Sequence, residues 1–523
     1  MLNDFDYDRL PTEPLGFGKY RNKTWTQIQA QDPGYLNWLK GSDFGRGDQT
    51  IIDVITSLQS TLVAKVDYDL MPDQQLAVDY FREQCLEGGH RVFRLNGGAG
   101  YGKSYAVTMM AKAAMQAGWT TITGIAASYV ATQVLAESLD PVNAESKTIA
   151  RALGLQPNKT AYRESYGPSQ HTDTMAGNLL EQDSLLIVDE YSMTDDTVVD
   201  IIYQAMNDNQ NNSILMVVGD EAQLPSPAQE HMCAFNTISP WSNLTIPKRF
   251  QPDSPLHRVE MGVRADPWVM SRVLTEQQTG SSVMQHVGFD AMVRQQIQDL
   301  EAYPEESGLM LFYRRDQVAK ANRNIRGIVY GQDAPDIVDG ERLRVMRTTF
   351  LPTIWDNENN KWVSQRHYSG TFLTAAETRI NAVKVSFHHT DLPANDMPDL
   401  EVVCHTVEHD NVVVPVVFSK TEHQADPETF GGPDFNQALG RITAYCQEHE
   451  HDIRGVWRLY HFFRSNFIQV SYGYATTVHR SQGASVDRVY LCPRDVLQGG
   501  DYMARRLAYV AATRAKQQLN FYI

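Results

Sequence analysis

Residues 94–107, RLNGGAGYGKSYAV, decide the fold: an apolar run ends in glycines, reaches Gly-Lys-Ser and continues as a segment that suits a helix. The pattern is G-x-x-x-x-G-K-S, with Gly97, Gly102, Lys103 and Ser104 at its fixed positions. In such a loop backbone N–H groups point at phosphate oxygens, the lysine reaches the β and γ phosphates, and the serine ligates magnesium. The stretch therefore predicts a site for the phosphates of ATP or GTP together with Mg²⁺.

The segments around this loop predict a parallel sheet. RVFRLN before it has the character of a short strand, and KSYAVTMMAKAAMQAG after it that of a helix. Further apolar runs, TTITGIA, SLLIVD and SILMVVG, alternate with helical segments between about residues 70 and 250. Such alternation is typical of an α/β fold with helices on both faces of the sheet, where ligands bind at the carboxyl ends of the strands.

Composition narrows the class of protein. The chain has 523 residues, a formal net charge of -17 and no apolar run of 18 residues, so we expect no membrane span. Its acidic start argues against a signal peptide and favours a cytoplasmic location. The negative charge argues against a uniformly basic coat, although a locally basic groove for nucleic acid is compatible with it. The five scattered cysteines indicate neither a disulfide framework nor a zinc cluster.

Three further regions follow the first α/β region or interrupt it. A polar, turn-rich stretch at 155–182 breaks the alternation of strands and helices. A second α/β region begins near residue 309 with LMLFYRRDQVAKANRNIR, and a β-rich segment at 341–464 interrupts it. The α/β pattern resumes at FIQVSYGYATTVHRSQG and continues to the C-terminus. We therefore expect a β-rich domain inserted into a second α/β domain.

Two acidic residues and a glutamine follow apolar strands. Asp189 and Glu190 end LLIVDE, where an aspartate can hold magnesium and the adjacent glutamate can polarise the attacking water. Taken alone, an Asp-Glu pair is as often a helix start. Gln223 in GDEAQLPSP can sense the γ phosphate or orient water, and the alternative for that segment is a surface turn.

The ordered set GGAGYGKS, VDEYSM, GDEAQLPSP, KRF, TTVHRSQGASVDRVYL and AYVAATRA resembles superfamily 1B DNA helicases. Helicases of the phage Dda type are the most similar, with bacterial RecD-type enzymes as relatives, and the resemblance covers residues 70–523. It implies two RecA-like parallel-sheet P-loop NTPase core domains with two insertions: a β-hairpin pin and an SH3-like β-rich domain. The stretch LGFGKYRNKTWTQIQAQDPGYLNWL resembles a small FGKY-type module that accompanies some exonucleases and helicases.

The expected domain plan begins with the small N-terminal module, followed by a glycine-rich, polar linker and a connecting helix. We expect the module to be a docking patch, for instance for a replication protein, or a folded cap, or else a direct contact for nucleic acid. The expected ranges are 1–46 for the module, 47–69 for the linker helix, 70–154 with 183–255 for RecA-like domain 1A, 155–182 for the pin, 256–340 with 465–523 for RecA-like domain 2A, and 341–464 for the SH3-like insertion.

The resemblance also implies roles in nucleotide chemistry. Gln74 in MPDQQLAV would bond adenine and favour ATP, and Gln223 would couple hydrolysis to DNA. Arg249 and Arg514 would cross from the second core domain to the γ phosphate, although either arginine alone could form a surface salt bridge. The expected catalytic residues are Lys103, Ser104, Asp189, Glu190, Gln223, Arg249 and Arg514; the nucleotide site adds Gln74, Gly97, Gly98, Ala99, Gly100, Tyr101, Gly102 and Gly483; Mg²⁺ would be held by Ser104 and Asp189.

For the single strand, the resemblance points to segments of both core domains. His479 could instead be a buried, hydrogen-bonded histidine. The chain departs from the family pattern at Ala127, Ala150 and the bulky Tyr101. The expected DNA contacts are Ser128, Tyr129, Thr148, Thr477, His479 and Arg480, and the candidate wedge residues of the pin are Tyr162, Tyr166 and His171.

We therefore expect a monomeric ATP-dependent DNA helicase that moves 5′ to 3′ along single-stranded DNA and opens forks in phage-type replication or recombination. The direction and the pathway rest on the family resemblance. Two alternatives stay open: a translocase that unwinds duplex poorly, and a remodelling factor whose DNA affinity ATP switches. A small-molecule kinase is disfavoured because it would leave the second α/β region and its arginine motif without a role.

Overall fold

The computed structural model describes most of the chain after residue 69. The expected N-terminal module, the linker helix and Tyr162 lie outside the described residues. The described part is 70–523 without 161–162, 170, 210, 227–228, 230, 250–252, 273–274, 279, 304–307, 347–348, 351–353, 357–360, 364–365, 368–370, 389–391, 394, 410–411, 419–432, 499 and 523.

The first sheet is parallel throughout, in the order β3-β2-β6-β7-β1-β8. Along β6, Leu185 and Ile187 join the core on one face while Leu186 and Val188 join the core on the other. Both faces are therefore buried, which is why the strands read as continuous apolar runs. The strands are β1 (Val92–Gly97), β2 (Thr121–Ala126), β3 (Glu145–Thr148), β6 (Ser184–Asp189), β7 (Ile214–Gly219) and β8 (Trp241–Leu244).

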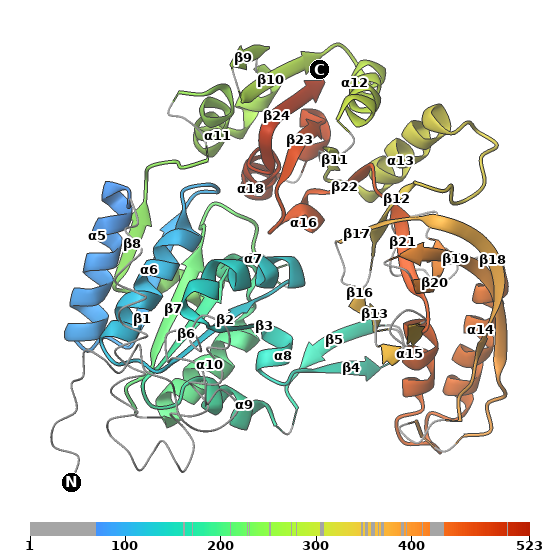
Figure 1. Cartoon of the computed structure of the whole chain (residues 1–523), viewed down its shortest axis with the longest axis horizontal. Helices are drawn as coiled ribbons and strands as arrows, with labels where there is room; N and C mark the ends of the chain where they lie inside the picture. Colours follow the sequence, from blue (N-terminus) through green and yellow to red (C-terminus); the bar gives the residue numbers. More distant parts are fainter. Residues whose placement is uncertain are drawn as a thin grey trace, which may run out of the picture.

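Helices cover both faces of this sheet (Figure 1). One core contains side chains of α5, α6 and α7, and the other contains side chains of α8, α9 and α10. The helices are α5 (Pro72–Phe81), which continues as a π-helical turn (Arg82–Glu87), α6 (Lys103–Gln116), α7 (Tyr129–Leu139), α8 (Ile149–Ala152), α9 (Thr172–Leu179) and α10 (Asp196–Asp208).

The second sheet has the order β22-β11-β23-β24-β10-β9 and is parallel except for the β9–β10 pair. The structure thus confirms the predicted α/β class with parallel-sheet, RecA-like cores. Its strands are β9 (Glu276–Gln278), β10 (Ser281–His286), β11 (Gly308–Phe312), β22 (Ala475–Thr477), β23 (Val486–Leu491) and β24 (Ala515–Tyr522); its helices are α11 (Pro255–Ala265), α12 (Phe289–Ala302), α13 (Arg315–Val329), α16 (Val478–Ser481), α17 (Pro493–Val496) and α18 (Gly500–Ala512).

A third, mixed sheet has the order β17-β12-β21-β20-β19-β18, in which only β20 and β21 pair in parallel. Helices α14 (Pro433–Glu448) and α15 (Trp457–Ser465) share a core with it. Its strands are β12 (Arg342–Val345), β17 (Phe372–Thr374), β18 (Ala376–Val385), β19 (Leu400–His409), β20 (Val412–Phe418) and β21 (Ile468–Tyr472); two small pairs accompany it, β13 (Thr349–Phe350) with β16 (Arg366–His367) and β14 (Ile354–Asp356) with β15 (Lys361–Val363).

The boundary expected at residue 465 differs from the strand pairing. Strand β21 belongs to the third sheet, and the chain re-enters the second sheet only at β22. An apolar run that is buried on both faces fits the middle of either sheet, so the sequence pattern does not distinguish them. The β-rich region therefore extends to Tyr472.

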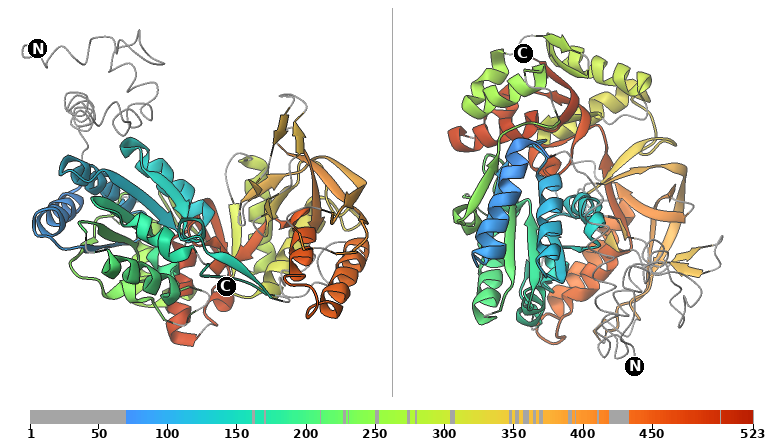
Figure 2. Two further views of the ribbon diagram at one scale, coloured as in Figure 1. Left: turned by 90° about the horizontal axis from the view of Figure 1, so that it is seen from below. Right: turned by 60° about the vertical axis from the view of Figure 1, so that its left-hand side comes forward.

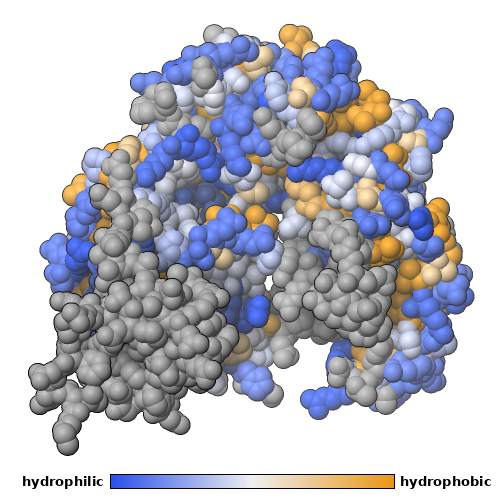
Figure 3. Space-filling view, viewed as in Figure 1, coloured by the Kyte–Doolittle hydropathy of each residue, from blue (hydrophilic) through white to orange (hydrophobic). Residues whose placement is uncertain are grey.

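A hairpin of β4 (Gln156–Thr160) and β5 (Arg163–Gly167) projects from the first sheet domain. Strand β4 contacts α15 of the β-rich region, so the hairpin spans the space between the two parts (Figure 2). The rest of the expected 155–182 insertion includes α9, whose Thr172 and Ala176 are buried. The face seen in Figure 3 is hollowed between the first sheet domain and the β-rich region.

Among the described helices, none combines the length and the apolar character needed to cross a membrane.

Candidate nucleotide and DNA sites

The phosphate loop joins β1 to α6 at the carboxyl edge of the first sheet. Gly100 and Gly102 have φ of +83° and +76°, a region that favours glycine. A Cβ at Gly102 would lie only 2.3 Å from Gln74 Nε2. Lys103 Nζ donates to the carbonyls of Gly97 and Gly98 at 2.9 and 3.1 Å. The lysine is thus folded back over the loop, where a phosphate could replace the carbonyls as its partner.

Gln74 supports this loop from α5. It is fully buried, its Oε1 accepts from Met71 N at 3.1 Å, and its Nε2 donates to Gly102 O at 3.0 Å. The neighbouring Asp73 accepts from the backbone N–H groups of Thr245 and Ile246 at 2.7 and 2.8 Å. The leading glutamine motif thus lies at the expected place, but in this structure Gln74 bonds the loop backbone.

The acidic pair ends β6 beside the phosphate loop. Asp189 Oδ1 accepts from Glu190 N at 2.9 Å, and Glu190 has the left-handed φ of +51° that is uncommon for a side-chain-bearing residue. Burial and the adjacent Glu190 raise the pKa of Asp189 to about 7, against an opposing effect of Lys103. Glu190 Oε2 is buried without a hydrogen-bond partner among the described residues. The site therefore carries acidic charge that a cation would stabilise.

A magnesium ion fits this donor set. Mg²⁺ is held by one or two protein oxygens and completes its octahedron with substrate phosphates and water. Ser104 opens α6 and Asp189 ends the adjacent part of the sheet, which supplies that number of ligands. In the described part of the chain no group of three or more His, Cys, Asp or Glu side chains could hold a metal alone.

Two arginines lie near the loop: Arg514 comes from the second sheet domain after α18, whereas Arg249, contrary to the expectation, belongs to the segment that follows β8 of the first sheet. Arg249 N donates to Gly100 O at 2.9 Å, and its Nη1 donates to Thr513 O of the second sheet domain at 3.3 Å. Arg514 is buried and donates to the carbonyls of Val510 and Ala484 at 3.1 and 3.0 Å. Burial lowers the pKa of both guanidinium groups, and Arg514 lowers that of Arg249 further, although Arg249 keeps an exposed surface. The structure thus places Arg249 against Gly100, close enough to Arg514 for the two charges to interact.

Gln223 is buried where the two sheet domains meet. Its Oε1 accepts from Gln482 Nε2 at 3.1 Å, and the same amide lies 3.2 Å from Leu224 O. Tyr509 OH donates to Asp220 Oδ2 at 2.6 Å. Gln482 and Tyr509 were not among the predicted site residues, although both lie inside the motifs TTVHRSQG and AYVAATRA.

Glu260 on α11 is another unpredicted residue of the cleft. Only 2% of it is exposed, neither carboxylate oxygen has a hydrogen-bond partner among the described residues, and a Cβ at Gly98 would lie 3.1 Å from its Oε1. Burial and then Asp220 raise its pKa to about 7. Tyr101 is buried and extends from the loop to the same helix, where its OH lies 3.6 Å from Met261 Sδ. No sequence motif marks Glu260.

The predicted DNA residues cap short helices at the domain boundary. Ser128 Oγ accepts from Ala131 N at 3.2 Å as the N-cap of α7, and Thr148 caps α8 in the same way. Thr477 occupies the position before α16. Gly483 lies against Ser128: a Cβ there would be 3.6 Å from Ser128 Oγ, with no atom of the phosphate loop within 4 Å. The geometry places Gly483 beside Ser128 at the start of α7, and its role at the nucleotide stays a prediction.

The other predicted DNA residues lie nearby or in the hairpin region. His479 is tilted against Tyr313, and burial followed by Arg315 lowers its pKa, so the neutral ring is favoured. Arg480 Nη1 is 3.4 Å from Met346 Sδ. The other positions are Tyr129, whose OH accepts from Gln133 Nε2 at 3.1 Å; His171, which is exposed just before α9 and outside the hairpin; and Tyr166, in β5.

Comparisons with known proteins agree with these motifs. The AAA domain family matches residues 69–248, and the UvrD-like helicase C-terminal domain family matches residues 472–522. The ATP-dependent DNA helicase dda of Enterobacteria phage T4 is 23% identical over 478 residues, which cover 87% of this chain and 99% of the phage protein.

Among solved structures, the Pif1 helicase from Candida albicans matches with 14% identity and a TM-score of 0.43, over 87% of this chain and 94% of that chain. A Bacteroides Pif1 bound to single-stranded DNA matches with 13% identity and a TM-score of 0.43, over 87% and 92%. The motifs in their order, the two matching families and the similarity along nearly the whole phage protein support a helicase of the Dda type.

Proposed function

We propose that this helicase is an ATP- and Mg²⁺-dependent motor that moves 5′ to 3′ along single-stranded DNA and separates strands at forks. The observation that carries the proposal is the position of Arg249, which bonds Gly100 of the phosphate loop through its backbone and Thr513 of the second sheet domain through its side chain. A change in what the phosphate loop binds would therefore shift the contact of Arg249 with the second sheet domain.

In this proposal, Lys103 exchanges its bonds to the loop carbonyls for the β and γ phosphates of ATP. Ser104 and Asp189 would hold Mg²⁺, which neutralises charge on the phosphates. Glu190, whose Oε2 has no hydrogen-bond partner in the part of the chain that the structure describes, would accept a proton from the attacking water. Arg249 and Arg514 would offset the charge that develops on the transferred phosphoryl group. Movement of the second domain would carry Arg514 toward the phosphates and away from them, while Arg249 stays beside the phosphate loop.

Ser128, Thr148 and Thr477 would contact the DNA backbone, since hydroxyl groups and helix N-terminal amides can bind phosphates without reading sequence. Gly483 would let the second domain approach Ser128 closely. The β4–β5 hairpin would act as the pin, braced by α15. The proposal also includes a monomeric motor, a partner for residues 1–46 and a role in phage-type replication or recombination.

Steady-state ATP hydrolysis with and without single-stranded DNA tests the proposal, together with unwinding of forks that carry only a 5′ or only a 3′ tail. We expect strong DNA stimulation and unwinding only from the 5′ tail. Hydrolysis that ignores DNA would contradict the motor, and unwinding from the 3′ tail alone would contradict the direction.

A further inference from the structure

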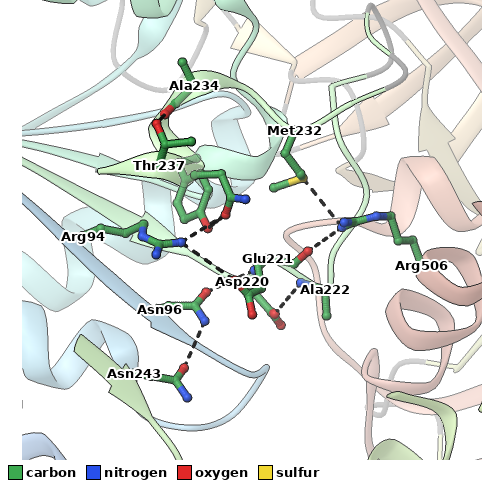
Figure 4. Close-up of polar contacts among 12 residues, drawn as sticks. Arg94, Asn96, Asp220, Glu221, Ala222, Met232, Ala234, Thr237, Asn243 and Arg506 are labelled. Carbon is green, nitrogen blue, oxygen red and sulfur yellow. Dashed lines mark hydrogen bonds and ion pairs between the residues drawn. The ribbon is translucent and has the colours of Figure 1, made fainter. Parts of the chain in front are cut away.

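The loop Asp220–Leu224 lies between the two sheet domains and is bonded to both. On the first-domain side, Asn96 Oδ1 accepts from Glu221 N at 3.1 Å, and Asn96 Nδ2 donates to Asn243 Oδ1 at 3.0 Å. Arg94 lies with its Nη1 3.8 Å from Glu221 Oε2 (Figure 4). Arg94 and Asn96 are buried in β1. The beginning of the loop is thus fixed to the first sheet.

On the other side, the same loop is held by the second sheet domain. Leu224 is 1% exposed and belongs to the hydrophobic core of that domain. Arg506 of α18 donates through Nη1 to the carbonyls of Glu221 and Gln223 (the Glu221 contact is drawn in Figure 4). Backbone carbonyls occupy fixed positions in each conformation of the loop. A guanidinium that donates to two of them therefore stabilises one loop conformation over others. Gln223 thus has two contacts with the second sheet domain: its carbonyl accepts from Arg506, and its side chain accepts from Gln482.

Helix α18 connects this contact to the nucleotide site. Tyr509 lies about one turn after Arg506 and bonds Asp220 at the start of the same loop. The helix then leads directly to Arg514. The Arg506 guanidinium also stacks on Tyr502, 4.6 Å from the ring centroid. A cavity of about 320 Å³ opens beside Arg506 and Tyr509, so hydrogen bonds, more than packing, hold the guanidinium there.

From these contacts we propose that Arg506 is a positioning residue that ties the Asp220–Leu224 loop to α18 and so couples DNA-dependent domain movement to ATP hydrolysis. The inference rests on the proposed motor. When the second domain moves, Arg506 pulls the backbone of Gln223, while α18 carries Arg514 by the same displacement. Without Arg506, the loop would still be anchored to the first sheet but would follow the second domain less closely.

The neighbouring residue provides a matched control. Arg505 precedes Arg506 on α18, but its Nη1 donates to the carbonyls of Arg264 and Ala265 within the second domain, at 3.4 and 2.7 Å. The experiment measures ATP hydrolysis by wild type, R506A, R506K and R505A, each with and without a saturating thymidine oligonucleotide, along with the melting temperature. We expect R506A to lower the ratio of stimulated to basal turnover about tenfold, the size of a typical coupling between sites. R506K should recover part of the ratio, because its ammonium can still donate to a carbonyl, and R505A should retain it.

A purely structural role for Arg506 would lower the melting temperature and reduce both rates by the same factor, leaving the ratio intact. That result, or an equal loss in R505A, would overturn the inference. If R506A does not fold, R506Q takes its place, and a wild-type ratio in R506Q, which loses the positive charge, would overturn the inference as well. A wild type that DNA does not stimulate would instead contradict the proposed motor itself, so the two failures are distinguishable.

Discussion

The first sheet domain presents loops to the nucleotide cleft, whereas the second presents helices and their ends. Asp189 ends the parallel strand β6 and Glu190 follows it, while Lys103 stands where the glycine loop after β1 enters α6. Arg514 and Glu260 instead depend on where α18 and α11 dock. Groups on the first side can therefore bind a nucleotide while the domain stays rigid, and groups on the second side change position whenever that domain moves.

The two arginines of the cleft differ in a way that sharpens this contrast. Arg514 is fastened by carbonyl groups within its own domain, whereas Arg249 follows the first sheet and bonds to Thr513 across the cleft. Arg514 is thus a fixed part of the moving domain. Arg249 belongs to the connection between the two domains, close to the backbone of Gly100.

The largest effect is expected from removing these guanidinium groups. Arg249→Ala should lower kcat about 10³-fold or more, the range seen when such groups are removed from other NTPases. Arg249→Lys should not restore it, because an ammonium lacks the planar fork of donors. Arg514→Ala should lose activity and also about 1–3 kcal/mol of stability, since buried carbonyls lose their donor. Steady-state hydrolysis and urea unfolding measure the two effects, with Arg272→Ala at an exposed site as the control.

A wild-type kcat in Arg249→Ala would show that the contact with Thr513 serves docking alone. A catalytic loss in Arg514→Ala without any loss of stability would contradict its fixed position within the second domain.

Glu190→Gln tests the chemistry of the first side. The amide has nearly the same shape but cannot accept the proton of the attacking water, so turnover should fall about 10²- to 10⁴-fold. Binding of a fluorescent ATP analogue should persist, because the phosphate loop is unchanged. Glu181→Gln, at an exposed site, should behave as wild type in both measurements. Equal hydrolysis by Glu190→Gln and wild type would place the base elsewhere.

The sequence predicted the first side of the cleft better than the second. Lys103 and Asp189 lie at fixed sequence distances from apolar runs. The local sequence of a strand end and the loop after it is enough to predict where such residues lie. Tyr509 and Gln482 lie inside recognised motifs, but their partners Asp220 and Gln223 are hundreds of residues away in sequence. Contacts of that kind depend on how the two domains dock, and a local sequence pattern does not predict docking. Glu260 has no motif at all.

The same limit explains one difference in the fold. The run that forms β21 is largely buried, so it suits the third sheet as well as the second. Gln74 bonds Met71 and Gly102 beside the phosphate loop, and its contact with adenine stays a prediction. For β21 the local pattern predicts a strand, and the packing around it decides which sheet the strand joins.

The β4–β5 hairpin offers a way to test strand opening separately from hydrolysis. Replacing residues 158–165 by two glycines should abolish fork unwinding and leave DNA-stimulated hydrolysis intact, because the cleft residues lie on other elements. The replacement ends well before α9, whose Thr172 and Ala176 belong to the buried interior. Fork unwinding and hydrolysis are measured on the same preparation. Equal loss of both activities would contradict the role of the hairpin as a pin.

The smallest expected effect concerns Glu260 and pH. Its carboxyl is harder to ionise in the folded chain, where the pKa is about 7, than at the ordinary value of 4.5. Its contribution to stability is therefore complete below about pH 4.5 and is lost as the pH rises through about 7. Glu260→Gln removes this dependence, so its advantage over wild type should grow between pH 5 and pH 8 by at most about 3 kcal/mol.

Urea unfolding at the two pH values measures that difference, with Glu137→Gln at an exposed site as the control. The same charge faces the phosphate loop near Gly98; Asp220 raises the pKa of Glu260 further, and the positive charges of Arg264, Arg249 and Lys103 oppose that effect. The variant should therefore also bind ATP more tightly at pH 8, where wild type presents a carboxylate. If the stability advantage of Glu260→Gln is equal at both pH values, Glu260 affects packing only. Its charge would then have no effect on ATP binding.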